Sequence, residues 1–226
     1  MVKQVHSGRS VISCMGDSLT HTSQTFSAGN DGGSIGGMYP TDYYSYKLQQ
    51  LLAGQNRDVL VRNFGIGGNT TAQMIARQAA LVQYEVPDIA IIWGGTNDPN
   101  TTVTRTNLAA LANYVKGKGC SKVLIVGNNL MNQTSGGETT AAPSSTYQAI
   151  RAAQAGAAAD ASVVFVDTFA YMAAKIADGT YADNSGVWMA ANSGDVHINP
   201  LGQTLVAQAV YNTIVAQDWL KFLARA

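Results

Sequence analysis

Five short apolar segments constrain most strongly how this chain can fold. They are rich in Val and Ile, mostly continuous in hydrophobicity, and cover residues 11–15, 59–63, 88–93, 122–126 and 162–166. Strands that are buried on both faces of a parallel sheet have this pattern. Helical patterns separate the five segments, at 72–82, 108–115, 147–159 and 201–214. Alternating strands and helices predict right-handed crossovers, and therefore an α/β fold: a three-layer α/β/α sandwich around a five-stranded parallel sheet.

No feature of the sequence interrupts this alternation of strands and helices. The chain has 226 residues, and neither a linker nor an internal repeat divides it, so we expect a single domain over residues 1–226. Three long loops, at 20–38, 128–145 and 178–199, follow positions near one edge of the predicted sheet. Ligands bind beyond the carboxyl ends of parallel strands, so these loops are predicted to form the walls of a pocket.

Composition excludes several kinds of partner. Charged residues make up only 12% of the chain, about half the usual share of roughly 25%, and 14 basic residues balance 14 acidic ones. No basic patch stands out, so nucleic acid is not an expected partner, and a polar, weakly charged surface suits neutral hydroxylated ligands. Cys14 and Cys120 are expected to be free, partly buried thiols.

No membrane partner is expected, because no apolar stretch reaches about 18 residues. The first ten residues lack the apolar core of a signal peptide. A cytoplasmic, a phage-associated and a secreted protein whose signal has been removed all fit this sequence. The oligomeric state is equally open.

Polar and glycine-rich segments stand where the predicted strands end. Three follow the first three strands and one precedes the last helical pattern: Gly16-Asp17-Ser18-Leu19, Asn63 to Thr70, Gly94 to Asp98, and Gly194 to Pro200. Because parallel strands end at one edge of a sheet, we expect the four segments to converge there although they are far apart in sequence.

Together these segments hold the groups that acyl transfer requires. Ser18 supplies a hydroxyl nucleophile, and His197 can act as its general base. An oxyanion needs donors, which the backbone N–H of Ser18, at an expected helix start, the backbone N–H of Gly68 and the side-chain amide of Asn97 can provide. Taken alone, Ser18 suits a helix N-cap and Asn97 a turn; the combination predicts ester hydrolysis.

The four segments resemble the motif blocks of the SGNH hydrolases, also called the GDSL esterase/lipase family. Ser18, Gly68, Asn97 and His197 match the residues that name the family, in the family's order, and the resemblance extends from residue 11 to about 205. It implies a flavodoxin-like sandwich (the SGNH hydrolase fold), no metal or other cofactor, and hydrolysis of esters or thioesters through an acyl-enzyme.

One position departs from the family pattern, which usually places an Asp three residues before the His. Gly194 stands there, and the nearest acid, Asp195, is two residues before His197. Three interpretations remain open. Asp195 orients His197 through an altered turn, Asp183 replaces it, or a Ser-His dyad works with a backbone carbonyl.

Two further residues are candidates for substrate contact, and two motif matches are rejected. Trp188 lies in a predicted pocket loop and His21 is three residues past Ser18, although packing and solvent exposure explain them equally simply. The Gly-x-Ser-x-Gly match at 32–36 lacks the flanking strand and helix of a hydrolase elbow. The glycines at 65–68 resemble a dinucleotide loop, but the third glycine position holds Thr70.

The sequence thus predicts a serine esterase for short-acyl, most simply acetyl, esters of a small molecule or carbohydrate. The first alternative is a lipase- or thioesterase-like enzyme for longer acyl chains. A second is a non-catalytic glycan-binding module on the same fold. A third alternative is electron transfer of the flavodoxin type, which rests on the predicted fold alone.

Overall fold

The computed structural model describes residues 8–21, 40–128, 144–181 and 197–224. Their core is a five-stranded, all-parallel sheet with the strand order β2-β1-β3-β4-β5. This order is the flavodoxin-like one, so the predicted fold class is confirmed. The strands are β1 (Ser10–Gly16), β2 (Val59–Gly65), β3 (Ile89–Trp93), β4 (Val123–Val126) and β5 (Val164–Val166).

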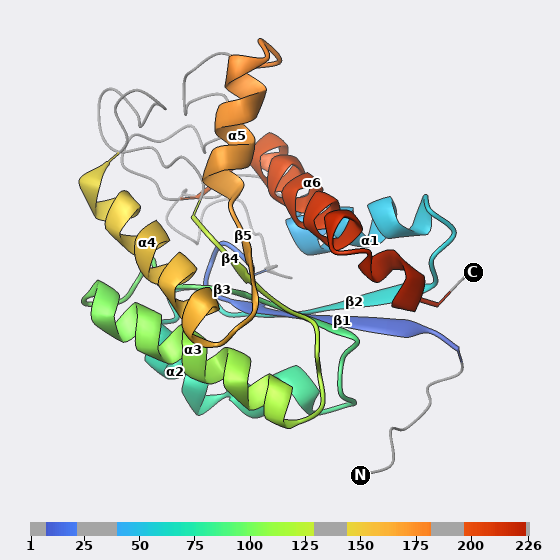
Figure 1. The fold of residues 1–226 in the computed structure, drawn as a ribbon, viewed down its shortest axis with the longest axis horizontal. Helices are drawn as coiled ribbons and strands as arrows, with labels where there is room; N and C mark the ends of the chain where they lie inside the picture. Colours follow the sequence, from blue (N-terminus) through green and yellow to red (C-terminus); the bar gives the residue numbers. More distant parts are fainter. Residues whose placement is uncertain (1–7, 22–39, 129–143, 182–196, 225–226) are drawn as a thin grey trace.

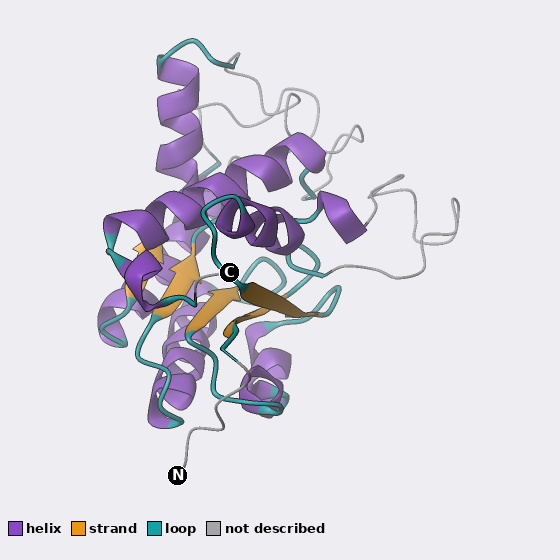
Figure 2. Ribbon diagram, turned by 90° about the vertical axis from the view of Figure 1, so that its right-hand side faces the viewer, coloured by secondary structure: helices purple, strands orange, loops and turns teal. Residues whose placement is uncertain are grey.

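Helices cover both faces of the sheet (Figures 1 and 2). One layer contains α1, α5 and α6 and the other contains α2, α3 and α4. Their bounds are α1 (Tyr44–Ala53), α2 (Thr71–Ala76), α3 (Thr101–Gly117), α4 (Ser145–Asp160), α5 (Thr168–Ala177) and α6 (Pro200–Ala216).

Successive side chains of the inner strands enter opposite layers, as the pleat of a strand requires. In β3, Ile89, Ile91 and Trp93 pack in the core beneath α1 and α6, whereas Ala90 and Ile92 pack beneath α3. All five residues are buried. Apolar residues on both faces explain why the strands read as continuous apolar runs in the sequence.

The predicted helices at 108–115, 147–159 and 201–214 are confirmed as α3, α4 and α6. The prediction of one helix over 72–82 is wrong, because α2 ends at Ala76 and a 3₁₀ turn, Gln78–Val82, follows. Arg77, between them, has φ −114° and ψ 19°, outside helical values. Helices α1 and α5 were not predicted.

The three predicted pocket loops fall largely outside the described residues, so their role as walls stays a prediction. Among the helices that the structure describes, none is long and apolar enough to cross a membrane.

Candidate active site

The strand order places the switch point of the sheet at the carboxyl ends of β1 and β3. These strands are neighbours, and the chain leaves them toward opposite ends of the sheet, which is the arrangement that opens a ligand crevice. The strand register sets Gly16 of β1 opposite Gly65 of β2 and Trp93 of β3. The three predicted motif segments that follow β1, β2 and β3 therefore begin side by side at the same edge of the sheet.

Ser18 lies in a single tight turn after β1, and the expected helix start at Ser18 is not found. The carbonyl of Asp17 accepts hydrogen bonds from the backbone N–H groups of Thr20 (3.1 Å) and His21 (2.9 Å). The Asp17 carboxyl accepts one from the N–H of Leu19 at 3.0 Å. This turn ends after one winding, and Ser18 is left partly exposed at its tip while Asp17 and Leu19 are buried.

A glycine at position 16 is required for this turn to fit. A Cβ there would lie 2.2 Å from Thr20 Oγ1 and 2.4 Å from the carbonyl oxygen of Trp93, both far closer than atoms can approach. The glycine of the Gly-Asp-Ser-Leu motif thus lets the turn fold back against β3.

The second segment joins the first directly at this edge. The N–H of Ile66 donates to the carbonyl of Gly16 at 3.1 Å. Gly68 is exposed, with φ +72°, a value that favours glycine, and a Cβ there would have no neighbour within 4 Å. Thr70 is the N-cap of α2 and forms a capping box with Gln73. The loop therefore presents the Gly68 backbone with open space around it.

The third segment joins the second through Asn97. Its side-chain Nδ2 donates to the carbonyl oxygen of Asn69 at 3.1 Å, next to Gly68, and Asn97 is itself exposed. Nδ2 carries two N–H donors, so one remains after this bond is made. The structure therefore brings the turn of Ser18, the Gly68 loop and the Asn97 side chain together, as predicted from the strand ends.

His197 lies at the entrance to α6. Asn199 caps this helix by accepting from the N–H of Gly202 at 2.9 Å, and Pro200 occupies its first turn. The helix is tied to the Ser18 turn by Gln203, whose Nε2 donates to the carbonyl of Leu19 at 3.2 Å. His197 is half-buried and its Nε2 atom is buried. Asp195, Asp183 and Trp188 lie outside the described residues.

His21 packs against the Gly68 loop. A Cβ on Gly67 would lie 3.5 Å from His21 Nδ1, and one on Gly65 would lie 2.4 Å from the His21 backbone nitrogen. Burial, and then the positive charge of Arg77, lower the pKa of His21 below its ordinary value. His21 is therefore a neutral, half-buried neighbour of the loop, and its contact with substrate stays a prediction.

Two residues that sequence reasoning missed support these segments. Arg77 bonds to the carbonyl oxygens of Gly16 and Phe64 and to the side chain of Asn69. Gln203 accepts from the N–H of Tyr44 at 2.9 Å in addition to its bond to Leu19. A signal existed for Gln203, since it is a polar side chain among the buried apolar positions of α6.

Sequence reasoning also missed a buried polar network beneath the third segment. Asn128, after β4, accepts from Trp93 Nε1 at 3.0 Å and from Gln154 Nε2 at 2.9 Å through its Oδ1 atom. Gln154 Nε2 also donates to the carbonyl of Gly94 at 2.8 Å. Asn128 Nδ2 donates to Thr96 Oγ1 at 3.2 Å. The network fixes the backbone just before Asn97 from inside the protein.

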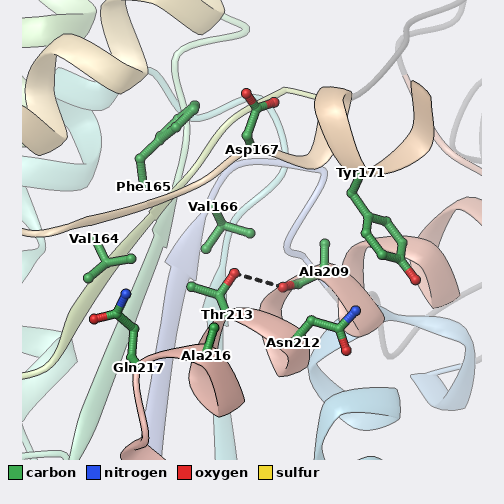
Figure 3. Close-up of a pocket in the computed structure, with 10 residues that line it drawn as sticks. All are labelled: Val164, Phe165, Val166, Asp167, Tyr171, Ala209, Asn212, Thr213, Ala216 and Gln217. Atoms are coloured by element: carbon green, nitrogen blue, oxygen red, sulfur yellow. Dashed lines mark hydrogen bonds between the residues drawn. The ribbon is translucent and has the colours of Figure 1, made fainter. Parts of the chain in front are cut away.

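A shallow pocket of about 340 Å³ lies elsewhere, between β5, α5 and α6 (Figure 3). Two strands, β3 and β4, separate β5 from β1. None of the residues lining the pocket belongs to the four motif segments. They are Val164, Phe165, Val166, Asp167, Tyr171, Ala209, Asn212, Thr213, Ala216 and Gln217. This pocket is therefore separate from the candidate site.

Over the described parts of the chain, His, Cys, Asp and Glu form no group of three suited to a metal ion.

A flavodoxin-like sheet with a Gly-Asp-Ser-Leu turn at its switch point places the chain in the class of α/β/α-sandwich hydrolases. The family model of the GDSL-like lipase/acylhydrolases matches residues 14–205, and the chain belongs to this family.

Solved structures share the fold at low sequence identity. A lipase/acylhydrolase from Enterococcus faecalis is 18% identical, with a TM-score of 0.66 over 92% of this chain and 96% of its own. A variant of an acetyl xylan esterase from Geobacillus stearothermophilus is 19% identical, with a TM-score of 0.66 over 91% and 94%. An α/β hydrolase from the metagenome of Lake Arreo, Spain, is 17% identical, with a TM-score of 0.67 over 93% and 96%. Comparison with curated protein sequences found no match.

Proposed function

We propose that the protein is a serine esterase in which Ser18 is the nucleophile and His197 the general base. The observation that carries the proposal is the hydrogen bond from Asn97 Nδ2 to the Asn69 carbonyl, at 3.1 Å. It holds an amide donor beside the Gly68 backbone, and the Ile66–Gly16 bond holds that loop beside the Ser18 turn. A nucleophile next to three converging donors suits acyl transfer.

The reaction proceeds in two halves. His197 takes the proton of Ser18 Oγ as this oxygen attacks the ester carbonyl, and the N–H groups of Ser18, Gly68 and Asn97 Nδ2 bind the resulting oxyanion. The bond to the alcohol oxygen then breaks, and His197 protonates the departing alcohol. Water attacks the acyl-Ser18 ester, gives its proton to His197 and releases the acid, and His197 returns the proton to Ser18.

Ser18→Ala is the direct test. We expect turnover of p-nitrophenyl acetate to fall by at least about 10³, because the covalent route is lost while donors and fold remain. A fluorophosphonate should label the wild type on Ser18 and should not label the variant, with circular dichroism as the check on folding. Wild-type protein that takes no label would instead favour the glycan-binding module, and full turnover by Ser18→Ala would exclude Ser18 as nucleophile.

The same assay identifies the group that orients His197, for which we propose Asp195. Loss of an orienting acid costs about 10⁴ in kcat in a serine protease. A large loss in Asp195→Ala with little change in Asp183→Ala supports Asp195, and the reverse supports Asp183. Near-native turnover by both variants supports a dyad with a backbone carbonyl.

For the substrate we propose a short acyl group, most simply acetyl, on a carbohydrate. The low share of charged residues, 12%, suits a neutral hydroxylated ligand, and the fold is shared with an acetyl xylan esterase. A series of p-nitrophenyl esters from acetyl to decanoyl, together with acetylated xylo-oligosaccharides, tests this. A maximum of kcat/KM at long chains would favour the lipase- or thioesterase-like alternative.

A further inference from the structure

One guanidinium group lies where the first two motif segments meet. Arg77 Nη2 donates to the carbonyl of Gly16 at 2.8 Å, Nη1 to the carbonyl of Phe64 at 2.5 Å, and Nε to Asn69 Oδ1 at 2.7 Å. Two acceptors are backbone carbonyls, at the end of β1 and near the end of β2, and the third is the side-chain oxygen of Asn69 in the loop before α2. One planar group therefore sets their mutual distances.

Two of the three acceptors are close in sequence to a donor of the proposed oxyanion hole. The Gly16 carbonyl is two residues before Ser18, and Asn69 directly follows Gly68. The carbonyl of Asn69 accepts from Asn97 Nδ2. Through Asn69, Arg77 is thus linked to the amide donor of the third segment as well as to the two backbone donors.

The local backbone accommodates this side chain. Helix α2 ends at Ala76, and Arg77 has φ −114° and ψ 19°, so the chain leaves the helical conformation at this residue. Arg77 is half-buried, and burial lowers the pKa of its guanidinium, although arginine stays protonated at neutral pH. Three of its five N–H donors are used by the bonds named above.

We propose that Arg77 is a positioning residue that holds the Ser18 N–H, the Gly68 N–H and Asn97 Nδ2 at the spacing an oxyanion requires. This inference rests on the proposed esterase function. Donors aimed at a developing charge act only if they are held in place beforehand, and a misplacement of about 1 Å can cost about 10² in rate. The rigid fork of arginine can bridge three acceptors at fixed angles, which the single ammonium group of lysine cannot do.

The test compares Arg77→Lys with a matched control, Arg62→Lys. Arg62 lies in strand β2, directly before the second motif segment, is partly buried, and its Nη2 donates to Glu85 Oε1 at 2.6 Å. We expect Arg77→Lys to lower kcat for p-nitrophenyl acetate by about 10² with KM changed less than about threefold, because the donors act mainly in the transition state. Arg62→Lys should keep kcat within about twofold.

Hydrogen exchange of the amides of residues 65–69 gives a second readout that does not depend on turnover. We expect faster exchange in Arg77→Lys than in the wild type, with no change in Arg62→Lys. If Arg77→Lys had the same kcat as the wild type, the inference would be overturned, because a positive charge alone would then be enough to position the donors. Equal losses of kcat in both lysine variants would overturn it too.

The exchange readout also separates this inference from the proposed function. If wild-type protein turned over no ester and took no fluorophosphonate, the esterase proposal would fail. Faster exchange at 65–69 in Arg77→Lys would then still support the positioning of the loops by Arg77, and unchanged exchange would overturn it. Should Arg77→Lys not fold, Arg77→Gln, which keeps two N–H donors, is measured against Arg62→Gln in the same way.

Discussion

The Asp17 carboxyl is fully buried directly before Ser18 and has few groups to stabilise a negative charge. Its Oδ1 atom accepts the Leu19 N–H at 3.0 Å, and Oδ2 is buried with no hydrogen-bond partner among the described residues. Burial, and to a smaller degree the negative charge of Asp98, raise the pKa of Asp17 to about 7, although bonds from backbone N–H groups oppose this rise. Asp17 is therefore a structural turn residue that titrates near neutral pH.

This pKa predicts how Asp17→Asn changes the pH dependence of stability. The unfolded chain releases the proton near pH 4 and the folded protein near 7, so Asp17 stabilises the fold at low pH and this contribution is lost as pH rises through 7. Between pH 5 and 8 the wild type should lose about 3 kcal/mol relative to Asp17→Asn, which keeps the acceptor for Leu19. Urea unfolding at several pH values measures the difference, and parallel curves for the two proteins would contradict the raised pKa.

Helices α2 and α3 are joined through the single carboxylate of Asp98. Its Oδ1 accepts from the Thr71 N–H at 2.7 Å, and its Oδ2 accepts from the hydroxyls of Thr71 at 2.6 Å and Thr104 at 2.8 Å. Thr71 begins α2, so its N–H has no partner inside the helix. Thr104 lies in the first turn of α3, and both threonines are fully buried. The residue after Asn97 thus connects two helices.

We predict that Asp98→Ala lowers the free energy of unfolding by about 2–3 kcal/mol and also lowers kcat. Removing the carboxylate leaves the buried Thr71 donors unsatisfied, whereas the Thr104 hydroxyl keeps a longer bond to the Asn100 carbonyl, at 3.3 Å. Thr102→Ala, on the exposed side of α3, is the matched control and should change stability by less than about 0.5 kcal/mol. Similar denaturation midpoints for the two variants would show that Asp98 does not join the helices.

An element could be predicted where its sequence pattern fits only one kind of secondary structure. The three inner strands combine Val and Ile with burial on both faces, which is the pattern that predicted them. In α1 the fully buried Tyr44, Leu48 and Leu52 follow the helical period, but aromatic Tyr43 and Tyr44 suit a strand equally well.

In the candidate site, the ends of the parallel strands predicted which segments meet. Arg77 was not predictable, because two of its acceptors are backbone carbonyls, which leave no mark on the sequence.

At the scale of the whole molecule, one side chain of α6 connects this helix with α1 and with the Ser18 turn. Gln203 of α6 accepts from the Tyr44 N–H, the first of α1, at 2.9 Å and donates to the Leu19 carbonyl at 3.2 Å. Helices α6 and α1 lie side by side on the same face of the sheet (Figure 1). Leu19 is 184 positions from Gln203 in sequence. The contact that places the His197 segment relative to Ser18 therefore joins parts of the chain that are far apart in sequence.

Gln203→Met tests whether this contact matters for both folding and catalysis. Methionine has a similar volume, but the Tyr44 N–H and the Leu19 carbonyl would be left buried and unpaired, each at a cost of about 1–3 kcal/mol. We expect the free energy of unfolding to fall by about 2–4 kcal/mol, and kcat to fall more than KM rises, because the base moves relative to its nucleophile. Gln208→Met is the control on the same helix, where the side chain bonds only Asn212 one turn further on. If urea unfolding and ester kinetics gave the same small changes in both variants, α6 would be held against the Ser18 turn by apolar packing alone.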